Sequence, residues 1–506
     1  MNKRIGIIDI GSNSVRLLLA DIGDKNSIRI INELKEYLRL GDGLDENKIL
    51  SEEKIELTLK TLTTYKNICT AFEVSEITAV ATEAIRSAKN QKEFLDKIET
   101  SIGLKITVLT GTEEAYYDYF STINSMTVDN ALIIDIGGAS TELILVKHRK
   151  LINSISIPFG AINLIKKFEI NDILDDDKEN ILKNFLIKQF NELEWLKEAK
   201  GYTLIGIGGS IRTLGKIHRK SINYPLNLMH NYHMKDTDII SIYNLVKSKN
   251  NVQRKKIKGL SSDRADIFVG AAAAISTLIE FCSIEDIIIS RNGIREGLLY
   301  SHICKDNTPI KDVLDFSINT LLINHNSNFR HAEHIYHLMN SLYSELKPLI
   351  KSACSLHNII KTSAMLHHIG SNITYYFHYK HSLYMILNSQ INGLSHRELV
   401  MSACIAASHR DDSFPINYSE YKTIITKEDL ETIRQLGLLL RLAENLDKSM
   451  ISIVKDVKCI IDEDTVIIKT ISDAMPTLEI KEALTATDEF KAVSYTHLRA
   501  HETSAH

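Results

Sequence analysis

The hydrophobic pattern of the chain opens with two similar segments, each made of two apolar runs around a glycine turn. The run over residues 5–8 ends at Asp9, and a Gly-Ser-Asn-Ser turn leads into a second apolar run over 15–20. The run over 131–134 ends at Asp135, and a Gly-Gly-Ala-Ser turn leads into another apolar run. Such runs around a glycine turn are typical of a β-hairpin. The repeat, with its aspartates 135 − 9 = 126 positions apart, predicts a duplicated α/β lobe with a cleft between the copies.

A partial third copy and several helices complete the pattern of the first three hundred residues. Residues 204–210 form an apolar run with a Gly-Gly-Ser end, and we expect a helix to follow from Ile211. Apolar positions at helical spacing predict long helices over 51–72 and 178–200. Strands that alternate with helices favour an α/β fold.

The pattern changes near residue 305, where strand-like runs give way to helices that continue to about residue 448. Eleven of the 19 histidines lie between His325 and His409 in this stretch. A strand is predicted over 465–470, and the segment 494–506 matches nothing before it, so we expect it to be foreign to the natural chain. The predicted parts are a first lobe over 1–125, a second lobe over 126–305, a helical domain over 306–450, a small β-containing appendage over 451–490 and a non-native tail over 491–506.

Composition places the chain among globular proteins with more than one core. Of its 506 residues, 44% are hydrophobic and 25% are charged. No run approaches the roughly 20 apolar residues that cross a bilayer, and the first apolar run meets Asp9 too early for a signal peptide. Six cysteines without a C-x-x-C pair indicate reduced thiols, so we expect a cytoplasmic protein without membrane contact.

The charge balance limits how the chain can bind anions. A net charge of −4 excludes adhesion of the whole surface to a polyanion, so an anion site requires a local group of cations. Two basic runs, 216–220 and 254–258 with Arg264, are candidates for a polyanion track. Either run alone could equally be a solvated helix face.

The two hairpin turns carry residues that suit a phosphate group. Glycine lets the backbone approach a ligand closely, and successive N–H groups in such a turn form an anion-binding nest. An aspartate beside a bound phosphate requires a cation between them, and oxygen ligands favour Mg²⁺. One such turn is often only a turn, but two matched copies with Gly208, Gly209 and Ser210 predict a phosphate site with bound magnesium.

Seven motifs in chain order resemble the exopolyphosphatase/guanosine pentaphosphate phosphatase family. They are DIGSNSVRL from Asp9, ATEAIR from Ala81, TGTEEA from Thr110, DIGGASTE from Asp135, GIGGSIR from Gly206, DRAD from Asp263 and SRNGIREG from Ser290. The resemblance covers residues 1 to about 305, and the helical extension fits the longer members of the family. It implies the two-lobed, ribonuclease H-like superfold of actin, Hsp70 and the sugar kinases, which agrees with the duplicated hairpins.

The resemblance also implies catalytic roles for three residues. Glu114 matches the catalytic base, its neighbour Glu113 is the alternative, and Arg86 matches a clamp on the terminal phosphate. Without the resemblance, the two glutamates would be interpreted as acids in the first turn of a helix, where they favour the helix dipole.

A metal site and a phosphate cradle follow from the same resemblance. Asp135 and Glu142 match residues that position the metal and the attacking water, and Asp9 assists them. One departure is Ala139, where a third glycine is usual, and its methyl group fits if φ stays negative. The predicted cradle consists of Ser12, Asn13, Ser14, Gly138, Ser140, Gly208, Gly209 and Ser210.

The helical domain resembles the HD-type metal phosphohydrolases in part. His331, His367, His368 and Asp447 lie where that superfamily places its metal ligands. His368 stands in place of the defining aspartate, which removes a hard oxygen ligand. We therefore expect a degenerate, HD-like domain with a structural or polyphosphate-gripping role, in which residues 378–381 add positive charge to the polyanion path.

The residues and the resemblance together predict a Mg²⁺-dependent exopolyphosphatase that releases orthophosphate from the end of inorganic polyphosphate. Hydrolysis of the 5′-terminal phosphate of guanosine pentaphosphate is the alternative, because it uses the same catalytic groups. A non-catalytic sensor of polyphosphate or alarmone and a sugar kinase are weaker interpretations. The resemblance further implies a homodimer, stimulation by K⁺ stays an open expectation, and no nucleic-acid partner is expected.

Overall fold

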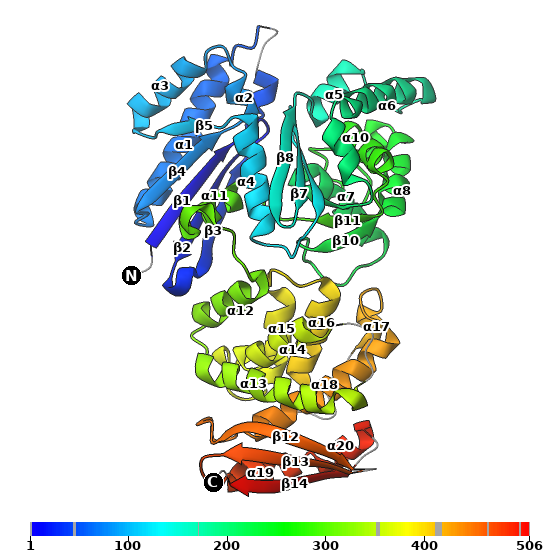
Figure 1. The fold of residues 1–506 in the computed structure, drawn as a ribbon. Coiled ribbons are helices and arrows are strands. Elements are labelled where there is room, and N and C mark those ends of the chain that lie inside the picture. The colour runs from blue at the N-terminus through cyan, green and yellow to red at the C-terminus, as the bar shows by residue number, and fades with distance from the viewer. Residues whose placement is uncertain are drawn as a thin grey trace. The chain divides into compact units, whose positions relative to one another are not determined.

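The computed structural model describes residues 3–43, 47–170, 172–350, 355–409, 417–462, 465–494 and 497–504. The chain divides into two compact units (Figure 1). Unit 1 contains Met1–Tyr224 and Leu228–Val313, and unit 2 contains Pro225–Asn227 and Leu314–His506. Both predicted hairpins lie in unit 1, so this unit positions the predicted phosphate site.

The first half of unit 1, lobe 1, is built on a five-stranded sheet. Its strands are β1 (Lys3–Ile10), β2 (Val15–Ile22), β3 (Ile28–Glu36), β4 (Glu76–Ala81) and β5 (Ile106–Val108). Its helices are α1 (Glu52–Ala71), α2 (Glu83–Arg86), α3 (Gln91–Ile102) and α4 (Gly111–Ile123). The strand order is β3-β2-β1-β4-β5, in which the β1–β2–β3 meander is antiparallel and β1, β4 and β5 are parallel.

The second half, lobe 2, repeats this arrangement. Its strands are β6 (Ala131–Ile136), β7 (Thr141–Lys147), β8 (Lys150–Ile157), β9 (Thr203–Ile207), β10 (Tyr232–Lys235) and β11 (Asp286–Ile289). Its helices are α5 (Ala161–Lys167), α6 (Asp176–Asn191), α7 (Gly208–Ser221), α8 (Asp236–Lys247), α9 (Asn251–Arg254), α10 (Phe268–Cys282) and α11 (Ile294–Ile303). Strands β8-β7-β6-β9-β11 match β3-β2-β1-β4-β5 in order and direction, and β10 is added at the edge. The predicted duplication is therefore confirmed.

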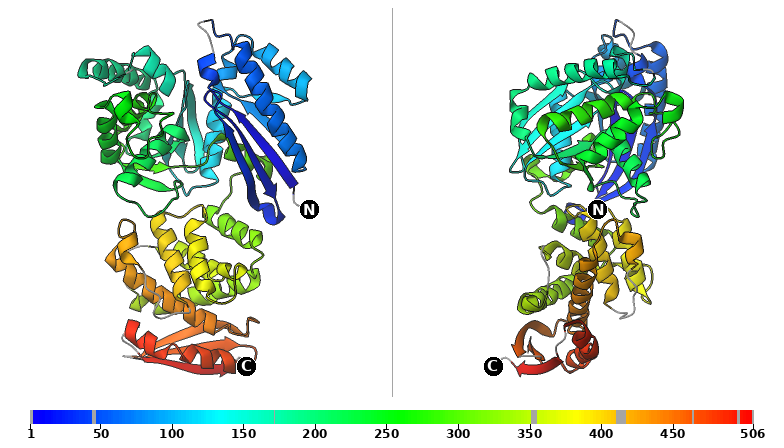
Figure 2. Two further views of the ribbon diagram at one scale, coloured as in Figure 1. Left: turned by 180° about the vertical axis from the view of Figure 1, so that it is seen from behind. Right: turned by 90° about the vertical axis from the view of Figure 1, so that its right-hand side faces the viewer.

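Both faces of the first sheet are buried, which explains the unbroken apolar run of β1. Ile8 and Ile10 pack in a core with α1 and α3, whereas Ile5 and Ile7 pack on the opposite face with Leu298 of α11. This alternation follows from the two-residue period of a strand. Helix α4 packs on β7 and β8 of the other sheet and also contacts α11, so these two helices lie between the sheets (Figures 1 and 2).

Two of the three predicted helix limits need correction. Helix α1 agrees with the predicted span 51–72, and the side chain of Ser51 caps it by accepting a hydrogen bond from the N–H of Lys54. Helix α6 ends at Asn191, because Leu193 leaves helical geometry before a short 3₁₀ helix, Glu194–Ala199, that brings Leu196 into the core. Helix α7 begins at Gly208, three residues earlier than predicted, so the glycines belong to its first turn.

Unit 2 begins with a helical region. Its helices are α12 (Val313–Asn324), which starts at the unit boundary, α13 (Phe329–Leu346), α14 (His357–Leu366), α15 (His378–Asn388), α16 (His396–Ser408), α17 (Tyr418–Tyr421) and α18 (Lys427–Asn445). After them come β12 (Val454–Asp462), β13 (Thr465–Ser472), α19 (Thr477–Leu484), α20 (Thr487–Ser494) and β14 (His497–Ser504). The three strands form one sheet in the order β12-β13-β14, and β13 contains the predicted strand. The domain limits inside this unit and the foreign origin of residues 491–506 stay predictions.

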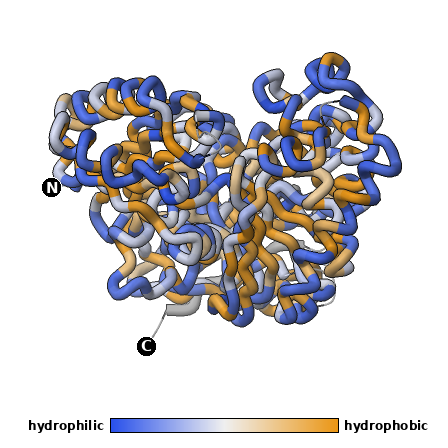
Figure 3. The backbone as a smooth tube through the Cα atoms, turned by 90° about the horizontal axis from the view of Figure 1, so that it is seen from above, coloured by the Kyte–Doolittle hydropathy of each residue, from blue (hydrophilic) through white to orange (hydrophobic). Residues whose placement is uncertain are grey.

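The hydropathy of the chain follows this architecture. Figure 3 shows hydrophobic stretches along the strands and mixed hydrophobic and hydrophilic stretches along the helices. Across the described ranges, no helix has both the length and the apolar character that a membrane crossing requires. Five cysteines in these ranges are unbridged, and the sixth, at position 354, lies outside the described residues.

Candidate active site

The turns of the two hairpins and the start of α7 line one cleft of unit 1. The sequence-predicted residues that line it are Asp9, Ser12, Asn13, Ser14, Glu114, Asp135, Gly138, Ser140, Glu142, Gly208 and Gly209. Glu113, Arg86 and Ser210 are not among its lining residues. Arg16, Thr82 and Glu83 also line the cleft, although sequence analysis assigned them no role.

The two hairpin turns have the same backbone hydrogen bond. The N–H of Gly11 donates to the carbonyl of Ser14 at 3.1 Å, and the N–H of Gly137 donates to the carbonyl of Ser140 at 3.0 Å. Each turn therefore closes over three residues in the same way. The duplication extends from the topology of the sheets to the geometry of the ligand-facing loops.

One carbonyl group in each turn accepts a hydrogen bond from a backbone N–H group of a neighbouring segment. The N–H of Gly41 donates to the carbonyl of Ser12 at 2.9 Å, and the N–H of Ile162 donates to the carbonyl of Gly138 at 2.9 Å. Within the described residues, four turn N–H groups have no acceptor, those of Ser12, Asn13, Gly138 and Ala139. Unpaired N–H groups beside a cleft form an anion-binding nest. Ala139 does not adopt a positive φ, so its methyl group fits in the place where a third glycine is usual.

The first turn of α7 approaches charged groups from both sides. A Cβ atom at Gly208 would lie 2.1 Å from Oδ1 of Asp135, and one at Gly209 would lie 2.0 Å from Nη1 of Arg264. Only glycine allows this approach. The N-terminus of the 14-residue helix also favours negative charge, so this end of α7 suits a phosphoryl group.

Glu114 lies in the first turn of α4 and is 4% exposed. Burial raises its pKa to about 7, although the paired Arg86 guanidinium counteracts this effect, and the nearby Asp9 and Asp135 raise the pKa further. A carboxyl group with this pKa is partly ionised at neutral pH. It can therefore both accept and return a proton, as a general base requires.

Arg86 holds Glu114 in place. Its Nη1 donates to the carbonyl of Leu109 at 2.6 Å and also binds Glu114, and its Nε donates to Glu83 at 3.0 Å. These bonds and a second bond to Glu83 use four of the five N–H groups of a guanidinium. The structure thus places Arg86 as a partner of the predicted base. Only one of its N–H groups remains to bind a phosphate, which is the role that the sequence analysis predicted.

Glu113 faces away from the cleft and caps α4. Its carboxylate accepts from the N–H of Thr110 at 2.8 Å and from the hydroxyl of Thr110 at 2.9 Å, which lowers its pKa. This is a capping box. Ser210, by contrast, is buried, and its hydroxyl lies 3.4 Å from the carbonyl of Ile136. Both residues have local structural partners in place of a ligand.

Asp118 is a buried acid that the sequence analysis missed. It follows Glu114 by four positions on α4, so the two carboxylates project from the same face of the helix. Asp118 is 1% exposed, and among the described residues neither of its carboxyl oxygens has a hydrogen-bond partner. Burial, Asp135 and Glu142 raise its pKa well above the ordinary value. The spacing of two acids at i and i+4 was the signal that could have identified it.

Three more carboxylates come from the hairpins. Asp9 and Asp135 are the last-but-one residues of β1 and β6. Burial is the main cause that raises the pKa of each, although each keeps part of its surface on the cleft. Glu142 is 4% exposed, and burial together with Glu114 and Asp135 raises its pKa to about 8. Ser156 donates to it from Oγ at 2.7 Å.

These five acids fit a hard divalent cation. Carboxylates buried close together raise one another's pKa unless a proton or a cation compensates them. The unpartnered oxygens of Asp118 are the clearest sign of missing compensation. Ligands that offer only oxygen suit Mg²⁺. The residues that would hold it are Asp9, Asp135 and Glu142, which line the cleft, and the buried Asp118 is a further candidate.

A group of cations faces the acids from both lobes. Burial lowers the pKa of Arg212 to about 10 and that of Lys35 to about 8, and in both cases Arg16 adds repulsion. Burial and Arg16 likewise lower the pKa of Arg264, which lines the cleft. A bound polyanion would relieve the repulsion among these cations, so binding would lower the electrostatic free energy of the site. Of this group, the sequence analysis had proposed only Arg264 for binding a polyanion.

The internal repeat places charges of opposite sign at equivalent positions. In the first hairpin Asp9 pairs with Arg16, and in the second Asp135 pairs with Glu142. Arg16 therefore occupies in lobe 1 the position that Glu142 occupies in lobe 2. At this position the two hairpins therefore differ in charge, with a cation in lobe 1 and an acid in lobe 2.

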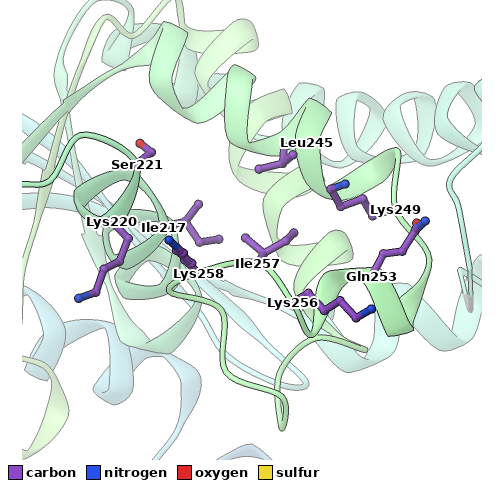
Figure 4. A pocket seen from close by; sticks show the side chains of 9 residues that line it. All are labelled: Ile217, Lys220, Ser221, Leu245, Lys249, Gln253, Lys256, Ile257 and Lys258. Carbon is purple, nitrogen blue, oxygen red and sulfur yellow. The ribbon is translucent and has the colours of Figure 1, made fainter.

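The two predicted basic runs meet in a separate pocket near the end of α7 (Figure 4). Four lysines line it and no carboxylate does, while Ile217, Leu245 and Ile257 supply apolar surface. The lysines are Lys220, Lys249, Lys256 and Lys258. Arg254 does not join them, because its side chain is buried and bonded to the carbonyls of Val246 and Asp172.

Another pocket adjoins the cleft at Asn13, which lines both. Its apolar surface comes from four isoleucines, Ile162, Ile165, Ile170 and Ile267. Its polar side chains include Asp263, Asp266 and Lys166. The polar and charged lining residues number seven, Asn13, Arg39, Asp42, Lys166, Asn251, Asp263 and Asp266, so the pocket combines an apolar face with many polar groups.

Comparison with known proteins agrees with this geometry. A family model described as the Ppx/GppA phosphatase family matches residues 18–306, and one described as Ppx/GppA phosphatase, domain III, matches residues 313–487. A bifunctional 3-dehydroquinate synthase/phosphatase of Fusobacterium nucleatum is 32% identical over 304 residues, which are 58% of this chain and 45% of that protein. The chain therefore spans less than half the length of this relative.

Two further relatives carry different names. A guanosine-5'-triphosphate,3'-diphosphate pyrophosphatase of Pseudoalteromonas atlantica is 26% identical over 452 residues, 86% of this chain and 84% of that protein. The crystal structure of an exopolyphosphatase from Cytophaga hutchinsonii superimposes with a TM-score of 0.56 at 26% identity, covering 60% of this chain and 98% of that one. The family models together match most of the sequence. This chain belongs to the Ppx/GppA phosphatase family.

Proposed function

We propose that this chain is a Mg²⁺-dependent exopolyphosphatase that releases orthophosphate from the end of inorganic polyphosphate. The observation that carries the proposal is a single cleft in which buried acids around Glu114 face cations that repel one another. Phosphoanhydride hydrolysis requires positioning and charge neutralisation more than covalent catalysis. Both requirements are met by groups that lie in or beside this cleft.

The roles of the residues follow from their positions. The turn N–H groups and the start of α7 hold the terminal phosphoryl oxygens, and Arg264 contributes positive charge beside them. Glu114, oriented by Arg86, accepts a proton from the attacking water. Bound Mg²⁺ would neutralise phosphoryl charge and orient that water. The carboxylates of Asp9, Asp135 and Glu142 would hold it in place.

The lysine pocket supports a long substrate. Gly208 lies in the cleft and Lys220 lies in the lysine pocket, 220 − 208 = 12 residues apart on α7. That separation is about 18 Å along a helix. A single terminal phosphate cannot span it, whereas a polyphosphate chain can occupy both sites. The four lysines would then bind the part of the chain that follows the reacting phosphate.

Hydrolysis of guanosine pentaphosphate is the second candidate function, and the pocket at Asn13 favours it. The isoleucine surface suits the face of a purine, and the carboxylates of Asp263 and Asp266 could accept hydrogen bonds from the donor edge of guanine. The relative from Pseudoalteromonas atlantica has a name that describes such a nucleotide activity. The same catalytic residues would act on either substrate.

Orthophosphate release from long-chain polyphosphate and from guanosine pentaphosphate, each with Mg²⁺, tests the proposal. Glu114→Gln should lower the rate on the preferred substrate by about 10²- to 10⁴-fold. Glu113→Gln is the matched control and should keep near wild-type turnover, because Glu113 caps α4. Cleavage of the nucleotide alone would favour the second function. Binding of both substrates without cleavage would show a sensor, and phosphate transfer to a sugar would show a kinase.

Three expectations from the sequence stay predictions, namely a homodimer, a cytoplasmic location and stimulation by K⁺. Size measurement in solution, cell fractionation and rate measurements with K⁺ replaced by another monovalent cation address them in turn.

A further inference from the structure

Five histidines and one glutamate meet inside the helical part of unit 2. They are His331 of α13, His367 and His368 after α14, His378 at the start of α15, His409 after α16 and Glu444 of α18. The ring of His368 is central, since its centroid lies 4.0 to 5.7 Å from those of the other four histidines. We call these six residues the histidine cluster.

The backbone fixes the protonation of three rings in the cluster. Their Nδ1 atoms lie 2.5 to 2.9 Å from backbone carbonyl oxygens, His367 from Ala364, His378 from Tyr375 and His409 from Ala406. A carbonyl oxygen can only accept a hydrogen bond, so each Nδ1 carries the proton. In the neutral ring, Nε2 is then a lone-pair donor.

These lone pairs face one another and a carboxylate. Nε2 of His378 lies 3.3 Å from Nε2 of His409, and Oε2 of Glu444 lies 3.4 Å from Nε2 of His409. Oε1 of Glu444 also lies 3.6 Å from Nε2 of His368. Three electron-rich groups at these distances repel one another unless a metal ion or a shared proton lies among them. The carboxylate is 4% exposed, so bulk water does not screen it.

Two further nitrogens lack a partner. Among the described residues, Nε2 of His331 and Nε2 of His367 have no hydrogen bond, although the two side chains are only 3% and 0% exposed. Nδ1 of His331 lies 2.8 Å from Oδ2 of Asp447, which orients the ring. A carboxylate behind Nδ1 and an open Nε2 are what histidine ligands of metal ions have.

We propose that unit 2 binds a divalent first-row transition metal ion through the histidine cluster. Two three-histidine sets, His331–His367–His368 and His368–His378–His409, each offer ligand atoms within 4.8 Å of one another. Imidazole nitrogen favours ions such as Zn²⁺, Fe²⁺ or Ni²⁺ over Mg²⁺. Glu444 supplies an oxygen ligand, which the sequence analysis considered lost when His368 replaced an aspartate.

The structure also changes the role expected for His378, the first of residues 378–381. His378 is 1% exposed and packs against other members of the cluster, so it is a proposed ligand and adds no charge to a polyanion path. The ligands come from five helical elements that are distant in sequence. An ion bound to them would hold those elements together and contribute its binding free energy to the folded state.

Metal analysis of the full-length chain tests the proposal. The protein is purified without metal-affinity resin, its metal content is measured by mass spectrometry, and the chelated protein is titrated with Zn²⁺, Fe²⁺, Mn²⁺ or Co²⁺. We expect near-stoichiometric binding of one or two ions per chain and a lower unfolding temperature in chelator. A chain that holds only traces of metal before and after titration overturns the proposal, and the cluster is then compensated by protons.

Two variants locate the ion. His409→Cys keeps a ligand at that position, so its Co²⁺ form should gain a thiolate-to-cobalt charge-transfer band in the near ultraviolet. His381→Gln is the control, since it changes a histidine of the same helix as His378 that is outside the cluster. Cobalt binding to the His409→Cys variant without this band would place the ion elsewhere and refute the assignment. Because the readout is spectroscopic, it is independent of phosphatase activity.

Discussion

Gly208 and Asp135 occupy adjoining space, such that a Cβ atom at Gly208 would lie 2.1 Å from Oδ1 of Asp135. The φ of Gly208 is also positive, at +80°. We therefore expect Gly208→Ala to displace the Asp135 carboxylate and to lower phosphatase turnover by at least about 10²-fold, the scale of a misplaced catalytic group. Orthophosphate release at saturating Mg²⁺ and substrate measures this loss.

Gly201→Ala is the matched control for that variant. Gly201 has a similar φ of +73°, and a Cβ atom there would meet nothing within 4 Å. Both substitutions carry the strain of a left-handed backbone, about 1 kcal/mol. Only Gly208→Ala crowds a carboxylate. Equal loss of activity in the two variants would attribute the effect to backbone strain and contradict the role given to Asp135.

Glu142 should destabilise the folded chain at alkaline pH. Burial and two nearby acids raise its pKa to about 8, so the folded state holds this proton more tightly than the unfolded state does. The stabilisation from the bound proton is complete below the unfolded pKa, near 4.5, and is lost as the pH rises through 8. Glu142→Gln removes that loss. We expect the variant to gain about 1–3 kcal/mol over wild type at pH 8.5 without metal.

Denaturant unfolding of both proteins at pH 5 and pH 8.5 measures this difference. At pH 5 the gain should be small, because the wild-type carboxyl group is protonated. Added Mg²⁺ should reduce the difference in unfolding free energy between the two proteins at pH 8.5, since a bound cation compensates the ionised acid. A variant that is destabilised equally at both pH values would show that Glu142 acts through packing.

The local pattern of the sequence was sufficient for the hairpins and their aspartates. A strand that is buried on both faces and followed by a glycine turn leaves a signal within about ten residues, as β1 and β2 show. The helix limits were less predictable, because α7 starts on glycines that are poor helix formers but fit beside Asp135 and Arg264.

The group of cations that faces the acids could not be derived from local pattern. Arg16, Lys35 and Arg212 come from separate strands and a helix of two lobes, and only the fold brings their charges together. The basic run that starts at Arg254 was misleading in part. Its first residue binds two carbonyl groups inside lobe 2, whereas Lys256 and Lys258 line the lysine pocket.

Replacing Asp118 should weaken Mg²⁺ binding more than it changes the stability of the fold. Burial and the nearby acids raise the pKa of Asp118 well above its ordinary value, so the fold disfavours its ionised form, and Asp118→Asn replaces the carboxyl group with a neutral group of the same size. If the carboxylate helps to hold Mg²⁺, the variant should need about 10- to 100-fold more Mg²⁺ for half-maximal activity. A Mg²⁺ titration of phosphatase activity measures this, with Asp129→Asn as an exposed control. An unchanged Mg²⁺ requirement would remove Asp118 from the metal site.

The lysine pocket should matter only for a substrate long enough to reach it. Simultaneous Lys220→Ala, Lys256→Ala and Lys258→Ala substitutions leave the cleft residues in place. We expect KM for long-chain polyphosphate to rise by at least about 10-fold and its salt dependence to weaken, since fewer counterions are released on binding. Cleavage of tripolyphosphate or guanosine pentaphosphate should be unaffected, because neither reaches about 18 Å beyond the reacting phosphate.

Three exposed lysines of lobe 1 provide a control of equal charge change, Lys60, Lys92 and Lys105. Their replacement by alanine should lower long-range attraction of a polyanion slightly and equally for every substrate length. A length-dependent effect in the pocket variant alone would place the polyphosphate chain along α7. An equal loss on tripolyphosphate would show that the lysines act on the cleft itself. Unchanged kinetics on the long chain would exclude the pocket from the substrate path and remove the structural argument for polyphosphate over the nucleotide.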